Sequence, residues 1–495
     1  MSVADSSKPF SYDLEVLTLV NNEGEGYDLR KVFLGVKIHE SIKSNFLLGE
    51  LAIVDSTGLL ENAKIFGQET LRVRFKAPFG LEDEIHDDDV IDQLFRIYKV
   101  SQVKRAGQNA YIYNLKFCSP ELIQAKRIRV SQAFRGSMTD IAGQLARDHL
   151  GISIEDGKGG KLTPYFEVRE KSQGDNYHVL IPNWSVNYSI NWLAAQAQGI
   201  DSQSGLQDSF FFFQSANGGY RLQSLASMMS VDYLNGDPFV YTPATIADTK
   251  TIPWDNVEAG RMGMGRRIQN YEIGSAANML EGIVQGLFGS KQITVNNTYQ
   301  YLSERTYSYL DKFYGGKEMA MNDYPLVRTT DEVMHIGEAA SQEDTSDLVA
   351  GTYAEYKSVS DYGDAHTILV SDRHFVNDIE NEINQASHNA HLGSAQLRQA
   401  VTQLLKYYSI NLLLPVRTDI TTGTLINLEI DAVRPGEQEE SEAYFHGRGK
   451  HLITDIMWEL TLDECKVNVK CIKDSLINEI ETTVTTLPEP IMEDS

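Results

Sequence analysis

The sequence is poor in cysteine and has no long apolar run, and both shortages exclude classes of protein. Cysteine occurs only at Cys118, Cys465 and Cys471, which is too few for a disulfide framework and is typical of a reducing compartment. No apolar run approaches the roughly 18 residues of a membrane helix, so we expect no membrane span. The first residues lack the basic and apolar regions of a signal peptide. We therefore expect the chain to be made and kept in a cytoplasm.

Basic residues are also scarce relative to acidic ones. Lys and Arg number 44 against 69 Asp and Glu, and the net charge is -25. Stable binding to DNA or RNA requires the opposite balance, because basic side chains neutralise phosphate. We therefore expect no stable nucleic-acid binding, although an acidic surface would let DNA pass without sticking.

Motifs of common catalytic sites are missing as well. The patterns HExxH, GxSxG and the Walker loop do not occur. His388 and His391, three residues apart on a predicted helix, could share a metal with Glu382. We interpret them as exposed helix histidines, because no cysteine or second histidine pair accompanies them. The sequence therefore predicts no enzyme, no metal site and no cofactor.

Alternating side chains in residues 409–476 predict four antiparallel strands. Every second residue is apolar, so each strand has one buried and one wet face. The inward sets are Ile410, Leu412, Leu414 and Val416; Ile426, Leu428 and Ile430; Leu452, Thr454, Ile456, Trp458 and Leu460; and Cys465, Val467, Val469 and Cys471. Turn signals separate the strands, which is typical of an antiparallel barrel or sandwich.

Residues 10–118 repeat this strand signature. About six strands and no convincing helix predict a small barrel. The clearest inward sets are Val32, Leu34, Val36 and Ile38; Leu71, Val73 and Phe75; and Tyr111, Tyr113, Leu115 and Phe117.

Residues 119–250 mix helices with strands. Ser137 and Asp140 form the pattern of a helix N-terminal capping box, and Gly151 predicts the end of that helix. A second short helix is expected after Ser189.

Four consecutive phenylalanines follow this second helix. Phe210, Phe211, Phe212 and Phe213 predict a strand that returns as a hairpin through the turn at residues 217–219. Such a run predicts burial on both faces of a sheet, or partial cover by another subunit.

A heptad pattern predicts a helix over residues 376–404. It is carried by Val376, Ile379, Ile383, Ala386, Ala390, Gly393, Leu397, Ala400 and Leu404. Two interpretations remain open: an intramolecular helix laid along a sheet, or a helix at a subunit interface.

Together these patterns predict a β-rich α+β fold with two antiparallel β-barrel domains, an intervening α+β domain and a polar insertion. The expected domains are a first barrel at 1–118, the α+β domain at 119–250, a second barrel with the heptad helix at 251–300 and 376–480, a loosely structured insertion at 301–375, and an acidic tail at 481–495.

Three segments resemble one known family. Residues 130–152 read VSQAFRGSMTDIAGQLARDHLGI, residues 183–200 read NWSVNYSINWLAAQAQGI before the four phenylalanines, and the strand run of 447–476 begins GRGKHLITDIMWEL. In this order they resemble baseplate central hub proteins of contractile-tailed, T-even-like bacteriophages, and more distantly the hub part of type VI secretion spike proteins. Residues 306–376 match no pattern of that family.

This resemblance implies a structural virion protein of the tail baseplate, assembled in the bacterial host cytoplasm. It implies a homotrimer with a ring of six similar barrels, which would adapt a hexameric tail tube to a three-fold spike and line the DNA exit channel. The implied partners are the tail tube protein, the central spike protein and baseplate wedge proteins.

Two alternatives of other classes remain: a tail-associated glycan-binding module, which would present its four tryptophans as a platform, and a cell-wall hydrolase.

For the hub, we expect intersubunit burial at the phenylalanine hairpin and the heptad helix. The candidate interface residues are Phe210, Phe211, Phe212, Phe213, Ile379, Ile383, Leu397 and Leu404.

Overall fold

The structure, a computed structural model, describes most of the chain. The described residues are 10–77, 90–107, 109–152, 166–172, 177–199, 209–217, 219–229, 238–241, 266–275, 278–296, 301–315, 320–327, 363–371, 385–430 and 447–478.

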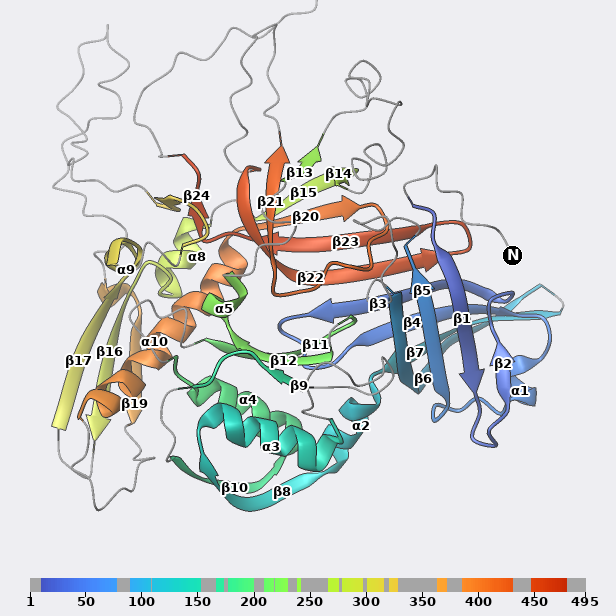
Figure 1. Ribbon diagram of the computed structural model, residues 1–495, viewed down its shortest axis with the longest axis horizontal. Helices are drawn as coiled ribbons and strands as arrows, with labels where there is room; N and C mark the ends of the chain where they lie inside the picture. Colours follow the sequence, from blue (N-terminus) through green and yellow to red (C-terminus); the bar gives the residue numbers. More distant parts are fainter. Residues whose placement is uncertain are drawn as a thin grey trace, which may run out of the picture.

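The largest unit is a 14-stranded sheet, whose first half comes from the amino-terminal part of the chain (Figure 1). In spatial order this half runs β3-β4-β7-β6-β5-β1-β2, and all its pairs are antiparallel. Its strands are β1 (Asp13–Val20), β2 (Gly26–Asp28), β3 (Phe33–Ser41), β4 (Leu48–Asp55), β5 (Thr70–Lys76), β6 (Val90–Ala106) and β7 (Ala110–Cys118). The one-turn helix α1 (Leu59–Asn62) follows β4.

The second half of the sheet is built mostly from the carboxy-terminal part. Its strands are β13 (Pro238–Tyr241), β14 (Arg267–Ile268), β15 (Asn270–Ser275), β20 (Ser409–Leu414), β21 (Leu425–Ile430), β22 (Gly449–Thr461) and β23 (Cys465–Ile472). The four strands predicted over 409–476 are all present, and their alternating apolar side chains are buried.

Strand β22 joins the two halves. Its first residues pair with β21, its later residues pair with β3 along the same edge, and β23 pairs along the opposite edge. With 13 residues it is about 40 Å long, enough to carry two partners end to end. The two halves are therefore parts of one hydrogen-bonded sheet.

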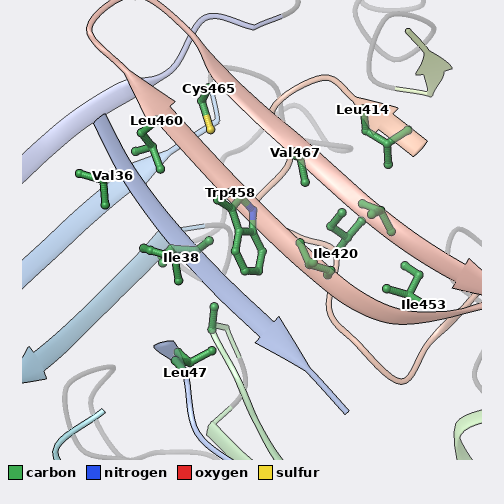
Figure 2. Close-up of a cluster of buried hydrophobic side chains, with 14 of the residues drawn as sticks. Val36, Ile38, Leu47, Leu414, Ile420, Ile453, Trp458, Leu460, Cys465 and Val467 are labelled. Atoms are coloured by element: carbon green, nitrogen blue, oxygen red, sulfur yellow. The ribbon is translucent and has the colours of Figure 1, made fainter. Parts of the chain in front are cut away.

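The core is shared between the halves as well. Figure 2 shows Val36 and Ile38 of β3 beside Trp458 and Leu460 of β22, and all four belong to one buried cluster. The Trp458 ring is fully buried, and its Nε1 donates to the Arg417 carbonyl oxygen at 3.0 Å. The bond satisfies the one polar atom of this side chain.

An α+β layer packs beside the sheet. Its elements are α2 (Pro120–Arg127), β8 (Arg129–Gly136), α3 (Met138–Leu150), β9 (Phe166–Val168), β10 (Tyr177–Ser185), α4 (Val186–Gln196), β11 (Phe210–Ser215), β12 (Gly219–Ser224) and α5 (Leu225–Met229). The predicted cap and end of α3 are confirmed: Ser137 Oγ accepts from the Asp140 N–H at 3.1 Å, and Gly151 adopts φ 68°.

The prediction for the next helix was wrong by one turn. Helix α4 starts at Val186, because Ser185 acts as its cap by accepting from the Tyr188 N–H. Ser189 lies inside the helix, where its hydroxyl donates to the Ser185 carbonyl at 3.0 Å.

A third unit combines a small sheet with the heptad helix. The sheet has β16 (Gly289–Asn296) between β17 (Tyr301–Ser308) and β19 (Thr367–Ser371), and α10 (Gln385–Tyr407) packs against it. Gln396 of α10 donates to the Ser290 carbonyl at 2.7 Å. The smaller elements here are α8 (Met279–Val284), α9 (Tyr309–Gly315), η7 (Gly363–Ala365), and β18 (Tyr324–Pro325) paired with β24 (Ser475–Leu476).

Two sequence expectations differ from these elements. The segment 301–375 was expected to be loosely structured, yet its described part forms β17, α9, β18, η7 and β19. Leu34 was expected to point inward with Val36 but is 42% exposed, because a β-bulge between Phe33 and Gly35 shifts the alternation.

The β-rich prediction is confirmed, since strands form most of the described elements and the main sheet is curled (Figure 1). Within the described strands, no pair joins β2 back to β3 or β14 back to β15, so each half is an open sheet there.

Trp458→Ala tests the shared core. The change empties a fully buried site, so we expect the free energy of unfolding to fall by about 3–5 kcal/mol. Tyr111→Ala is the control, because the Tyr111 side chain is 41% exposed on β7, and we expect a loss below about 1 kcal/mol. Urea denaturation followed by circular dichroism measures both. Equal losses would contradict the central position of Trp458.

Candidate assembly interface

A buried carboxylate lies where the two sheet halves and the β11–β12 hairpin meet. Glu40 of β3 has no exposed surface. Its oxygens accept from the Ala216 N–H at 2.8 Å, the Thr422 N–H at 2.8 Å and the Thr422 hydroxyl at 2.7 Å. Burial raises the pKa of Glu40, and the three donors, helped by the Arg221 charge, oppose that rise. One side chain thus connects β3, the tip of the hairpin and the loop between β20 and β21.

The hairpin makes further polar contacts with the first half of the sheet. Gln93 of β6 donates from Nε2 to the Ala216 carbonyl at 2.7 Å. The Leu47 N–H donates to Gln214 Oε1 at 3.1 Å, and the Ser119 hydroxyl also donates to that oxygen. The hairpin is therefore fixed by its own chain, and its position depends on the first half.

The four phenylalanines are mostly covered by this intramolecular packing. Phe210, Phe212 and Phe213 are at most 2% exposed, and Phe211 is half-buried. Phe210 and Phe212 pack in the cluster under α3 and α4, whereas Phe213 packs in the cluster that contains Leu405 of α10. The hairpin thus packs on both of its faces inside one chain, and Phe211 keeps part of its surface exposed.

Helix α10 also packs within its own chain over the described residues. Leu404 is 6% exposed in the main core, and Leu397 is half-buried. Arg398 donates from Nη1 to the Ala194 carbonyl of α4 at 3.0 Å, and burial lowers the pKa of Arg398. The helix continues through residues 393 and 394 without a break. Ile379 and Ile383 lie outside the described residues.

Glu40 itself was missed by the sequence reasoning, although the sequence contains a signal for it. Val36, Ile38 and Glu40 are two residues apart, so the strand pattern places the carboxylate on the inward face. A charge at an inward position needs buried partners. Those partners come from residues 216 and 422, which no local pattern connects to β3.

Of the four tryptophans that a glycan-binding module would present, three lie in the described residues. Trp458 is in the core, Trp184 and Trp192 pack together with ring centroids 5.5 Å apart, and Trp254 lies outside the described residues. Over the part of the chain that the structure describes, no three His, Cys, Asp or Glu side chains gather to hold a metal ion. No described helix has the length and apolar character of a membrane span.

Glu40→Gln tests the connecting role of the carboxylate. The amide places an NH2 donor where an N–H or O–H donor already points, so we expect the free energy of unfolding to fall by about 1–3 kcal/mol. Glu459→Gln is the matched control on the same strand pair, because Glu459 forms a partly exposed ion pair with Lys37, and its loss should stay below about 1 kcal/mol. Urea denaturation at neutral pH measures the free energy of unfolding of both variants. A Glu40 variant that is as stable as the wild type would contradict the connecting role of the carboxylate.

Comparisons with known proteins give structural neighbours only. No protein-family model matches the chain, and no curated protein matches it either. Among solved structures, it is similar to a tail protein from Neisseria meningitidis MC58 (TM-score 0.45, 10% identity, covering 94% of this chain and 97% of that one). It is also similar to the 43 kDa tail protein of prophage MuSo2 from Shewanella oneidensis (TM-score 0.47, 9% identity, covering 93% and 98%).

A third neighbour is the Escherichia coli c3393 protein, a component of the type VI secretion system (TM-score 0.38, 8% identity, covering 94% of this chain and 77% of that one). These scores and identities are low. Two of these neighbours are described as tail proteins and the third as a component of the type VI secretion system.

Proposed function

We propose that the chain is a structural protein of a contractile phage tail, and that three copies form the central hub of its baseplate. Residues 130–152, 183–213 and 447–476 carry the resemblance that motivates this proposal. The hub would adapt the six-fold tail tube to a three-fold spike and line the channel through which DNA leaves.

The observation that carries the proposal is the side-by-side arrangement of two curled half-sheets in one chain. Each half is mainly antiparallel, and the pairing of β22 with β3 joins them edge to edge. We interpret the halves as two barrel-like domains. A chain that contains two similar units can meet a six-fold ring on one side while three-fold symmetry relates its copies.

The charge supports the same proposal. With a net charge of -25, an acidic channel wall would repel the DNA backbone and let it slide. In this proposal the partners are the tail tube protein, the central spike protein and the baseplate wedge proteins, and the protein resides in the virion tail. No observation on the described residues favours the glycan-binding or cell-wall hydrolase alternatives.

The domain division expected from the sequence is part of the proposal. The first barrel at 1–118 and the second at 251–300 and 376–480 would contribute to the ring, and the α+β domain at 119–250 would lie beside them. The described residues require two changes to this division, because β13 belongs to the second half-sheet, and β16 and α10 belong to the third unit. Of the candidate interface residues, Phe211 and Leu397 are half-buried and keep surface that a neighbouring copy could cover.

The mass of the purified protein in solution tests the oligomer. Multi-angle light scattering over a range of concentrations should give three times the chain mass of 55.5 kDa. A dimer, or a monomer that stays monomeric when the spike is co-expressed, would contradict the trimeric hub.

Leu397→Asp tests whether α10 contributes to the interface. A charge on a half-buried apolar position should weaken trimer formation at least about tenfold, as expected for a well-packed interface residue. Thr402→Asp is the control on the same helix, because Thr402 is exposed. Sedimentation velocity measures association, and circular dichroism checks that each variant folds. If the Leu397 variant assembles like its control, α10 is not part of the interface.

A further inference from the structure

The three-stranded sheet of the third unit has two edge strands. In spatial order it runs β17-β16-β19, and among the described strands none pairs with the outer side of β17 or of β19. In Figure 1 this sheet lies at the opposite end of the molecule from β1 and β2. An edge strand carries a row of unpaired N–H and C=O groups, which is a template for pairing with another strand.

Strand β19 lacks the usual protection of an edge. Natural edge strands are protected by charged side chains, by proline or by bulges. The sequence of β19 is TILVS, without a charge or a proline, and its five residues pair with β16 in an unshifted register. Leu369 at its centre is 73% exposed. We therefore expect a regular, uncharged and apolar edge of this kind to be covered in the assembled protein.

The backbone of Leu369 is directed to the free side of β19. The Lys291 N–H donates to the His366 carbonyl oxygen at 2.8 Å, which fixes the phase of the parallel ladder. In such a ladder, alternate residues of a strand bond to the same neighbour. His366 and Ile368 therefore face β16, whereas the N–H and C=O groups of Leu369 point away from it, where a further strand would lie.

Strand β17 offers the complementary edge. It runs antiparallel to β16, whereas β19 runs parallel to β16. An identical sheet placed beside this one in the same orientation therefore brings its β17 next to β19 in the antiparallel direction, which is the commoner kind of strand pair. Both edges of such a contact are described, and both belong to this chain.

The exposed leucines of the two edges lie on one face of the sheet. Leu302 of β17 pairs with Val295, and Leu369 of β19 pairs with Ile293. Val295 and Ile293 are two residues apart on β16, so all four side chains share a face. Ser290, whose hydroxyl contacts Gln396 of α10, lies on the other face. Leu302 is 66% exposed, so joining two sheets would cover apolar surface on both edges.

We propose that β17 of one copy adds to β19 of the next copy, so that the small sheets of neighbouring copies join edge to edge. Main-chain hydrogen bonds would supply affinity, and the meeting of Leu302 with Leu369 would select the register. The contact is heterologous and closes into a ring when three copies repeat it around one axis. The inference rests on the proposed trimer and names the strands that hold it together.

Other strands could also satisfy the β19 edge, such as a further strand of the same chain or β19 of a second copy. These cases differ in which residues meet. The proposed contact brings Leu302 of one copy to Leu369 of another. Within one copy β16 separates these residues, so they lie at least about 10 Å apart. That separation exceeds the limit of about 7 Å between Cα atoms that a disulfide can bridge.

Cysteine pairs test the contact in the full-length protein. We expect Leu302→Cys/Leu369→Cys, after mild oxidation, to give a covalent trimer of three times 55.5 kDa on a non-reducing gel. Leu302→Cys/Thr367→Cys covers the register shifted by two residues, because Thr367 lies on the same face of β19. The single-cysteine variants are matched controls that should stay unlinked, and the native cysteines are buried.

The gel outcomes separate this inference from the trimer proposal. If both pairs stay unlinked while light scattering gives a trimer, the strand-addition inference is overturned and the trimer stands. A covalent dimer from Leu369→Cys alone means that β19 meets β19 of another copy, which also overturns it. A wild type that stays monomeric at every concentration, with and without the spike, overturns both.

A proline at residue 369 tests whether the backbone makes the contact. Leu369→Pro removes an N–H that points away from β16, so the sheet of the same copy keeps its hydrogen bonds. Leu369→Ala is the control that shortens the side chain and keeps the N–H. We expect the proline variant to associate roughly tenfold more weakly than the alanine variant in sedimentation velocity. Equal association of the two variants would overturn strand addition, and circular dichroism checks that both fold.

Discussion

The pairing of two strands along one edge of β22 is the constraint on which the rest of this structure depends. Strand β22 holds β21 and β3 in succession, so the amino-terminal and carboxy-terminal half-sheets become one hydrogen-bonded surface with a shared core. Separating them would break a strand pair and expose Trp458 and Ile38 together. The angle between the halves is therefore set by backbone pairing, which is more restrictive than contact between two loosely linked domains.

The β11–β12 hairpin is a third segment at this junction, beside the two half-sheets. Glu40 accepts hydrogen bonds from the hairpin tip and from the loop before β21, at the place where β3 meets β22. A buried carboxylate is costly unless its donors are all in position, so this arrangement favours one relative placement of the three segments. As a consequence, the side chains at this junction are already packed against residues of the same chain. In the proposed trimer, surfaces for neighbouring copies would come from elements that keep exposed area.

Local periodicity revealed much of this fold, because alternation reports which face of a strand is buried. It worked best where one face is continuously apolar, as in residues 465–471 of β23. It failed for β17, whose exposed residues are mixed polar and apolar and whose sequence therefore resembles a loop. It also failed at Leu34, where a bulge changes the face without any change in composition. The contacts of Glu40 could not be predicted from the sequence, since its donors lie 176 and 382 residues away and only the assembled fold brings them together.

The junction at β22 also bears on the proposed hub role. A protein that matches a six-fold ring with three copies needs its two similar units at a fixed angle, because any change in that angle would alter the spacing of the six positions. A flexible linker between two barrels could not hold that spacing, whereas a shared sheet does so without further contacts. In the proposed hub, the same rigidity would leave each copy unable to adjust to its neighbour by bending.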